Sequence, residues 1–170
     1  FSISCNNPPA PPSDLRQFRC NGHPLEVGKK VYVTTVILKA VVSDPDGDKV
    51  RLEVEAYSLT KGSRKHIESD LVDSGEEVAI IATFSDGCYR WKARALDEHG
   101  LCSEWVEFGD NRSQDPDFCV EVRTVKELVA LAGDGEIALS FTNPGAGANE
   151  IEKVIIKRKV GEYPQGPDDG

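Results

Sequence analysis

The sequence predicts an all-β protein built around an antiparallel β-sandwich, and three observations support this class. Apolar residues alternate with polar ones in several runs, as in residues 36–42 and 50–56. Clusters of turn-forming residues separate these runs, and none of them has the period of an amphipathic helix. Strands of this length and spacing indicate a sandwich of about seven strands in about 90 residues.

The first two strands are expected at residues 36–43 and 50–56. In each, every second side chain is small or aliphatic, so one face is predicted to enter the core. On the second strand, Arg51, Glu53 and Glu55 are predicted to face water. The intervening run Ser43-Asp44-Pro45-Asp46-Gly47-Asp48 is dense in turn formers, so the chain is expected to reverse there.

The rest of the sandwich follows the same pattern. A short edge strand is expected at residues 64–68, and a longer strand at residues 77–84. After a turn at residues 85–87, the next strand is expected to bury Tyr89, Trp91, Ala93 and Ala95 on one face. The tip of the last hairpin is expected at residues 97–100, and the closing strand begins near Trp105.

The sandwich is predicted to span residues 25–109, between flanking segments of different composition. Residues 1–24 contain Asn-Asn-Pro-Pro-Ala-Pro-Pro and no hydrophobic period, which favours a semi-rigid linker. Residues 110–123 are rich in charge and are predicted to be a second linker. In residues 124–170, runs around Val129, Ile137 and Val154 are expected to form three strands, too few to bury a core alone.

Two runs of the sequence, Val41–Val50 and Tyr89–Ala95, resemble immunoglobulin-like and fibronectin type III-like modules of bacterial and archaeal secreted and cell-surface proteins. The resemblance implies a buried tyrosine whose hydroxyl bonds back to the backbone, with Phe84, Gly87 and Tyr89 in the corresponding positions. Residues 133–144 resemble the start of a fibronectin type III domain, so residues 124–170 are expected to be a truncated second module. Such modules serve as spacers, adhesins and enzyme appendages alike, so the resemblance implies a fold rather than a reaction.

Four aspartates are the candidate metal ligands. Asp44, Asp46 and Asp48 alternate along one turn, and Asp97 is expected at the same end of the sandwich. Calcium takes six to eight oxygen ligands, so carboxylates converging from two loops suit it. The competing interpretation, which the sequence alone favours, is that Asp-Pro-Asp-Gly is a turn sequence that needs no metal.

The five cysteines, Cys5, Cys20, Cys88, Cys102 and Cys119, fit an oxidising compartment better than the cytosol. Their odd number leaves at least one unpaired within the chain. Their long spacings disfavour zinc, because zinc ligands usually come in close pairs, and His99-x-x-Cys102 is a weak match. Scattered thiols or a single disulfide are therefore expected rather than a metal site. We expect an extracellular or cell-surface location.

Composition narrows the classes of partner. The net charge of -9 disfavours nucleic acid as a partner, and no run is long enough to span a bilayer. There is no methionine, which suggests a fragment of a longer protein whose neighbouring modules are its first partners. Asn111-Arg112-Ser113 is a glycosylation sequon.

The expected function is that of a non-catalytic spacer or adhesion module that meets proteins or polysaccharides at a cell surface. No nucleophile motif accompanies His23, His66 or His99, and no phosphate-binding loop is present. The alternative is an accessory carbohydrate- or substrate-binding module of an extracellular hydrolase, in which Trp91 or Trp105 would stack on sugar rings. Burial is the preferred interpretation of Trp91, because it shares a face with Tyr89 and two alanines.

Overall fold

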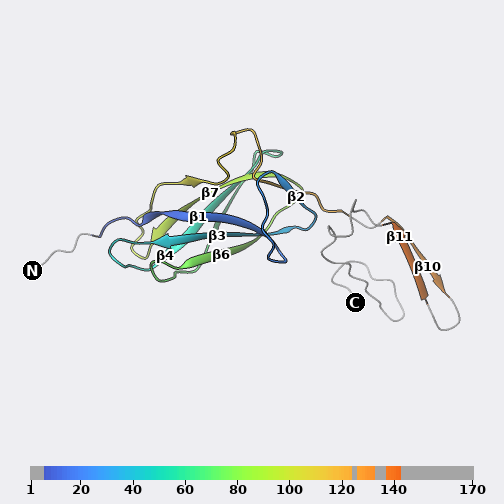
Figure 1. Cartoon of the computed structure of the whole chain (residues 1–170), viewed down its shortest axis with the longest axis horizontal. Coiled ribbons are helices and arrows are strands. Elements are labelled where there is room, and N and C mark those ends of the chain that lie inside the picture. The colour runs from blue at the N-terminus through green and yellow to red at the C-terminus, as the bar shows by residue number, and fades with distance from the viewer. Residues whose placement is uncertain (1–5, 124–125, 133–136, 143–170) are drawn as a thin grey trace, which may run out of the picture. The chain divides into compact units, whose positions relative to one another are not determined.

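A computed structural model describes residues 6–123, 126–132 and 137–142 of the chain (Figure 1). The chain divides into two compact units, residues 1–123 and residues 124–170. Within the described residues every regular element is a β-strand, and no helix there is long and apolar enough to cross a membrane.

Two sheets make up the first unit, and Figure 1 shows β1, β3 and β6 lying side by side in one of them. That antiparallel sheet contains, in order, β1 (Ala10–Arg19), β3 (Thr35–Ser43) and β6 (Glu77–Thr83). The other sheet contains, in order, β2 (Lys29–Val31), β9 (Phe118–Val120), β7 (Gly87–Asp97), β4 (Val50–Ser58) and β5 (Arg64–Glu68), with β8 (Val106–Glu107) also paired to β7. The fold class is therefore the predicted all-β sandwich, with nine strands in residues 6–123 rather than about seven.

The core lies between the two sheets and follows the predicted alternation. The inward residues of β3 and β6 face those of β4 and β7 in one continuous apolar cluster. Trp91 is the largest fully buried side chain, at 1% exposure, and the small Ala93 and Ala95 follow it on the same face of β7. Burial of such side chains is the main force that holds the two sheets together.

The predicted tyrosine corner is present. The Tyr89 hydroxyl donates a hydrogen bond to the Ser85 backbone carbonyl at 2.9 Å, four residues upstream. Phe84 and Phe118 are buried against the tyrosine ring, with centroid separations of 5.0 and 5.5 Å for Phe84–Tyr89 and Tyr89–Phe118. This cluster fixes the turn that leads into β7 and supports an immunoglobulin-like sandwich.

The interpretation of residues 1–24 as a linker is wrong, because residues 10–19 form β1 and pair with β3. Two features hid this strand. Its fully buried residues are Pro12 and Gln17, with Leu15 only partly buried against the core, and its register shifts twice between Ala10 and Arg16. Proline is tolerated because β1 is an edge strand, where a missing N–H leaves no ladder bond unmade.

The interpretation of residues 110–123 as a linker also fails, because β9 lies within the second sheet. Phe118, Cys119 and Val120 are all buried, and β9 pairs in parallel with β2 and antiparallel with β7. Cys88 and Cys119 stand opposite each other in that antiparallel pair and form a disulfide. A run of only three apolar residues after a charged segment gave no period to detect.

In the second unit, the described residues form β10 (Lys126–Ala132) and β11 (Ile137–Thr142), which pair antiparallel. These are the two strands expected around Val129 and Ile137. The third expected strand, around Val154, lies outside the described residues.

Candidate functional site

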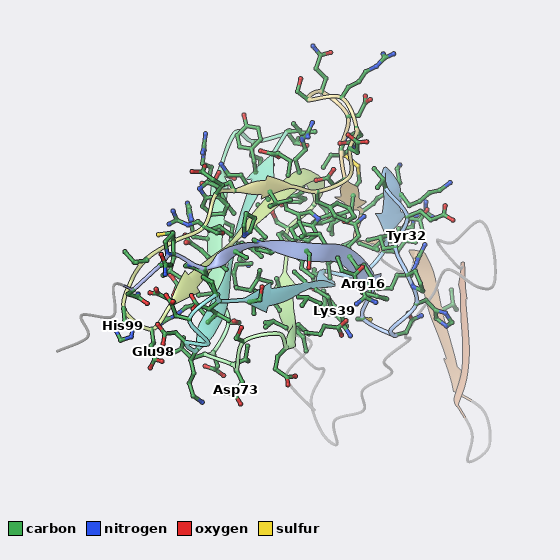
Figure 2. The ribbon with its side chains drawn as sticks, turned by 60° about the vertical axis from the view of Figure 1, so that its left-hand side comes forward. Arg16, Tyr32, Lys39, Asp73, Glu98 and His99 are labelled. Carbon is green, nitrogen blue, oxygen red and sulfur yellow. A yellow bond between two sulfur atoms is a disulfide. The ribbon has the colours of Figure 1, made fainter. Side chains whose placement is uncertain are left out.

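Three segments meet at one end of the sandwich: residues 6–7, the β3–β4 turn at residues 44–48, and the tip after β7 at residues 97–100. The β4–β7 pairing places Val50 opposite Asp97, so the turn and the tip leave the sheet as neighbours. The Glu98 backbone N–H donates to the Lys49 carbonyl at 3.0 Å and ties the two loops together. Figure 2 shows Glu98 and His99 projecting from this end. We call this set of segments the acidic end.

Asp44 closes the β3–β4 turn, as the turn interpretation predicted. Its Oδ1 accepts hydrogen bonds from the backbone N–H groups of Asp46 at 2.8 Å and Asp48 at 3.4 Å. The residue is only 7% exposed, and its Oδ2 is a buried oxygen with no hydrogen-bond partner in the described part of the chain. A buried carboxylate oxygen without a donor is costly, and a cation is one way to satisfy it.

Asp97 stabilises the second loop in a similar way. Its Oδ1 accepts from the backbone of His99 at 2.9 Å and Leu101 at 2.7 Å, and its Oδ2 accepts from Asn6 Nδ2 at 2.7 Å. Burial acts to raise the pKa of Asp97, but hydrogen bonds from Leu101, Asn6 and His99 outweigh it, so the pKa lies below its ordinary value. The carboxylate is therefore kept ionised although it is 1% exposed.

Asp46 holds the N-terminal segment against the turn. The Asn7 backbone N–H donates to Asp46 Oδ2 at 2.6 Å, and Asn7 Nδ2 donates to Oδ1 at 3.0 Å. Together, Asn6 and Asn7 connect Asp97 on one loop with Asp46 on the other. Sequence reasoning assigned both asparagines to a linker and so missed them.

Asp48 lies beside Glu98 and His99, and one ligand atom from each falls within 4.8 Å of the others. The His99 Nε2 atom is 3.5 Å from Asp48 Oδ2. Burial raises the pKa of Asp48 and the neighbouring carboxylates add to this, while the charge of His99 opposes it. Among the described residues, no three of the four predicted aspartates form a group this close. Glu98 was not predicted, because only the β4–β7 register brings it to Asp48.

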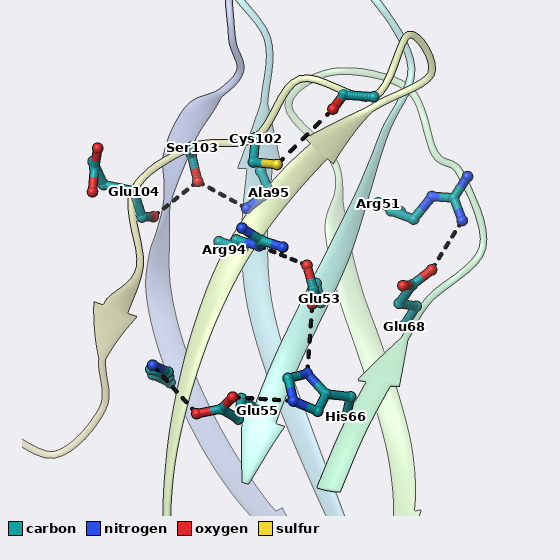
Figure 3. A network of polar contacts seen from close by, with 12 residues as sticks. Arg51, Glu53, Glu55, His66, Glu68, Arg94, Ala95, Cys102, Ser103 and Glu104 are labelled. Carbon is teal, nitrogen blue, oxygen red and sulfur yellow. Dashed lines mark hydrogen bonds and ion pairs between the residues drawn. The ribbon is translucent and has the colours of Figure 1, made fainter. Parts of the chain in front are cut away.

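A second polar cluster covers the outer face of the β4–β5–β7 sheet (Figure 3). Glu53 and Glu55 were predicted to face water, but they are 7% and 8% exposed because neighbouring side chains cover them. His66 lies between them, 3.1 Å from Glu55 and 3.6 Å from Glu53. Burial acts to raise the pKa of Glu55, yet Lys92, Arg64 and His66 together lower it.

The two tryptophans have different surroundings. Trp91 is buried, as the sequence pattern predicted, and its Nε1–H donates to Gln17 Oε1 at 3.1 Å. Trp105 is half-buried on the outer face, where Lys92 and Arg94 lie 4.7 and 4.6 Å from its ring centroid. On the same face lies an open groove of about 590 Å³, whose lining includes Tyr57, Arg64, Arg90, Glu107 and Asn111.

Comparison with known proteins gives little further information. No model of a known protein family matches the chain, and no curated protein matches it. Among solved structures, the PKD domain of an M14-like peptidase from Thermoplasmatales archaeon SCGC AB-540-F20 is similar at 24% identity and a TM-score of 0.40. That match covers 61% of this chain and 95% of the other.

The class of the first unit therefore follows from its own architecture. Two facing sheets that are antiparallel except for the β2–β9 pair, one shared core and the tyrosine corner define an immunoglobulin-like β-sandwich. None of these features assigns the unit to the fibronectin type III family in particular.

Proposed function

We propose that residues 6–123 act as a non-catalytic spacer or adhesion module of a secreted or cell-surface protein, stiffened by calcium at the acidic end. The observation that carries this proposal is the buried Oδ2 of Asp44, which has no hydrogen-bond partner among the described residues, at the end of the sandwich that also carries Asp46, Asp48 and Asp97. The disulfide between Cys88 and Cys119 supports an oxidising location outside the cytosol. The proposed partners are neighbouring modules of the same parent chain and proteins or polysaccharides at the cell surface.

The candidate ligands are Asp44, Asp46, Asp48 and Asp97. All four supply carboxylate oxygens, the hard donors that calcium prefers. A bound calcium would satisfy Asp44 Oδ2 and offset the repulsion among these charges. Because Asn6 and Asn7 already bond to Asp97 and Asp46, the same ion would stiffen the N-terminal segment against both loops.

Thermal unfolding in excess EDTA and then in millimolar calcium tests this proposal. A ligand that binds only the folded state raises the unfolding midpoint by mass action, so calcium is expected to raise it. Asp46→Ala is expected to abolish most of the rise. Asp73→Ala is the matched control, because Asp73 is exposed and its carboxylate pairs with Lys49 outside the proposed ligand set. An unchanged midpoint in the wild-type chain would reject calcium and leave a plain spacer.

The second candidate function is an accessory carbohydrate-binding module, which the groove beside Tyr57 and the half-buried Trp105 favour. Aromatic rings with flanking charged and amide groups are suited to stacking on and hydrogen bonding to sugars. Soluble polysaccharides are expected to quench the tryptophan fluorescence of the chain, and Tyr57→Ala is expected to weaken the response because Tyr57 lines the groove. Trp105→Phe identifies the source, because Trp91 is 1% exposed but also borders the groove: a response that disappears comes from Trp105, and one that persists comes from Trp91. An absent response across neutral and acidic glycans would reject this candidate.

A further inference from the structure

Asp117 is a fully buried carboxyl group that joins several strands and has no part in the acidic end. Its backbone N–H donates to the Tyr89 carbonyl at 2.8 Å, and its own carbonyl accepts from Gln17 Nε2 at 2.8 Å and Gly28 N–H at 2.9 Å. Its side-chain Oδ2 accepts from the Trp91 backbone N–H at 2.8 Å. The residue thus connects β7, β1 and the start of β2, just before β9 begins.

The other carboxyl oxygen of Asp117, Oδ1, is buried without a hydrogen-bond partner, and so is Oδ1 of Asn111. Both oxygens lie close to Gly109, at 2.6 and 3.2 Å from the position that a Cβ on that glycine would occupy. The Asn111 amide is oriented by its Nδ2, which donates to the carbonyls of Asp115 at 3.3 Å and Pro116 at 3.1 Å. Two buried acceptor oxygens therefore border the same glycine, and neither accepts a hydrogen bond within the described residues.

Protonation of the Asp117 carboxyl would give both oxygens a hydrogen-bond partner without any additional ligand. Calcium would need about six to eight oxygens, whereas a protonated carboxyl needs only one acceptor. We propose that Asp117 is protonated at acidic pH and donates its Oδ1–H to Asn111 Oδ1, forming a latch that fastens residues 109–117 onto β7. At neutral pH and above, the carboxyl has lost that proton, the hydrogen bond is absent, and a negative charge faces the Asn111 oxygen.

The electrostatic surroundings agree with this geometry. Burial raises the pKa of Asp117 to about 6, although the Trp91 N–H, the charge of Arg90 on β7 and the Asn111 side chain act to lower it. Glu107 on β8 acts in the raising direction. The groups that bond to Asp117 from β1 and from the residue before β2 are uncharged, namely the Gln17 amide and the Gly28 backbone.

The direction of the pH dependence follows from that pKa. Because the folded value lies above the ordinary value of 3.8, the stabilisation is fully present below about pH 3.8 and is lost as the pH rises through about 6. The latch is therefore closed under acidic conditions and already weakened at neutral pH. Residues 109–117 are expected to exchange their amide hydrogens faster in the weakened state, after correction for the intrinsic effect of pH.

The direct test is a carbon-detected NMR titration of the Asp117 carboxyl group in the wild-type chain, with EDTA present throughout so that calcium plays no part. A midpoint near pH 6 is expected. A midpoint below about 4, the ordinary range of an exposed aspartate, would overturn the proposal. It would mean that the Asn111 amide is turned round, with Nδ2 donating to an ionised carboxylate.

Asp117→Asn supplies a second test, because an amide can accept from Trp91 and donate to Asn111 as the protonated acid does. Relative to wild type, its folded-to-unfolded ratio in urea is expected to increase on the order of a hundredfold between pH 4 and pH 8. Asp115→Asn, at an exposed position in the same segment, is the matched control and should show no such change. A difference between Asp117→Asn and wild type that is independent of pH would also overturn the latch.

Discussion

Gly109 shows how tightly a single residue is constrained around the buried carboxyl. Its φ of +91° lies in the left-handed region, and an added Cβ would fall 2.6 Å from Asp117 Oδ1. Gly109→Ala is therefore expected to destabilise the fold by about 2–4 kcal/mol, from backbone strain plus overpacking. Urea denaturation of the variant measures this loss.

Gly75→Ala is the appropriate comparison for that measurement. Gly75 has a similar φ of +94°, but a Cβ there meets nothing within 4 Å. The free energy of unfolding of Gly75→Ala is therefore expected to fall only by the strain of the left-handed conformation, about 1–2 kcal/mol. Equal losses at Gly75 and Gly109 would show that Asp117 yields to the added methyl group and that its position is not rigid.

At the scale of elements, the stability of β9 depends on its neighbours rather than on its own three residues. The disulfide between Cys88 and Cys119 closes a segment of 31 residues, which includes β8 and the Asn111 loop. Replacing both cysteines by alanine is expected to cost about 3–4 kcal/mol, because the unfolded chain gains freedom. Chemical denaturation under oxidising conditions measures the loss.

Cys102→Ala is the control for the disulfide variant, since Cys102 carries an exposed free thiol on the loop after β7. It should leave the denaturation midpoint within experimental error of wild type. If the double variant matched Cys102→Ala, burial of Phe118 and Val120 alone would be enough to hold β9 in the sheet.

For the whole molecule, charge is distributed unevenly between the surfaces of the first unit. The outer face of the second sheet pairs Glu53 with Arg94 and Glu55 with Arg64 and Lys92, so its carboxylates have partners. At the acidic end, carboxylates outnumber cations, and Lys49 pairs with Asp73 instead. The unbalanced carboxylates at the acidic end are where a cation is proposed to bind. The groove of the sugar-binding alternative lies instead on the charge-balanced outer face.

Much of the core was predictable from the sequence, whereas the edges were not. The burial of β3 and β7 alternates along the strand because one side meets the core and the other meets water or polar groups. β1 lacks that alternation, since its fully buried residues are Pro12 and Gln17 and its register shifts. Predictions based on the hydrophobic alternation therefore failed where a bulge interrupted it or where the strand was too short to show it.

The candidate sites divide in the same way. Asp44 and Asp97 were found from turn composition, because aspartate side chains accept backbone hydrogen bonds in turns. The β4–β7 register brings Glu98 and His99 to Asp48, which is far from them in the chain, and a hydrogen bond to Asp97 brings Asn6 to the same end. Asp117 was not singled out, because it lies in the charged segment that the sequence predicted to be a linker.

By itself, the sequence determined the all-β class, the tyrosine corner and the inward faces of the central strands, because these depend on residues close together in the chain. Only the tertiary structure decided which cysteines pair, that β1 and β9 complete the sheets, and that Asp117 is buried beside Asn111. The reason is physical: hydrophobic period is a local property, whereas strand pairing and the burial of a charge depend on which distant segments meet.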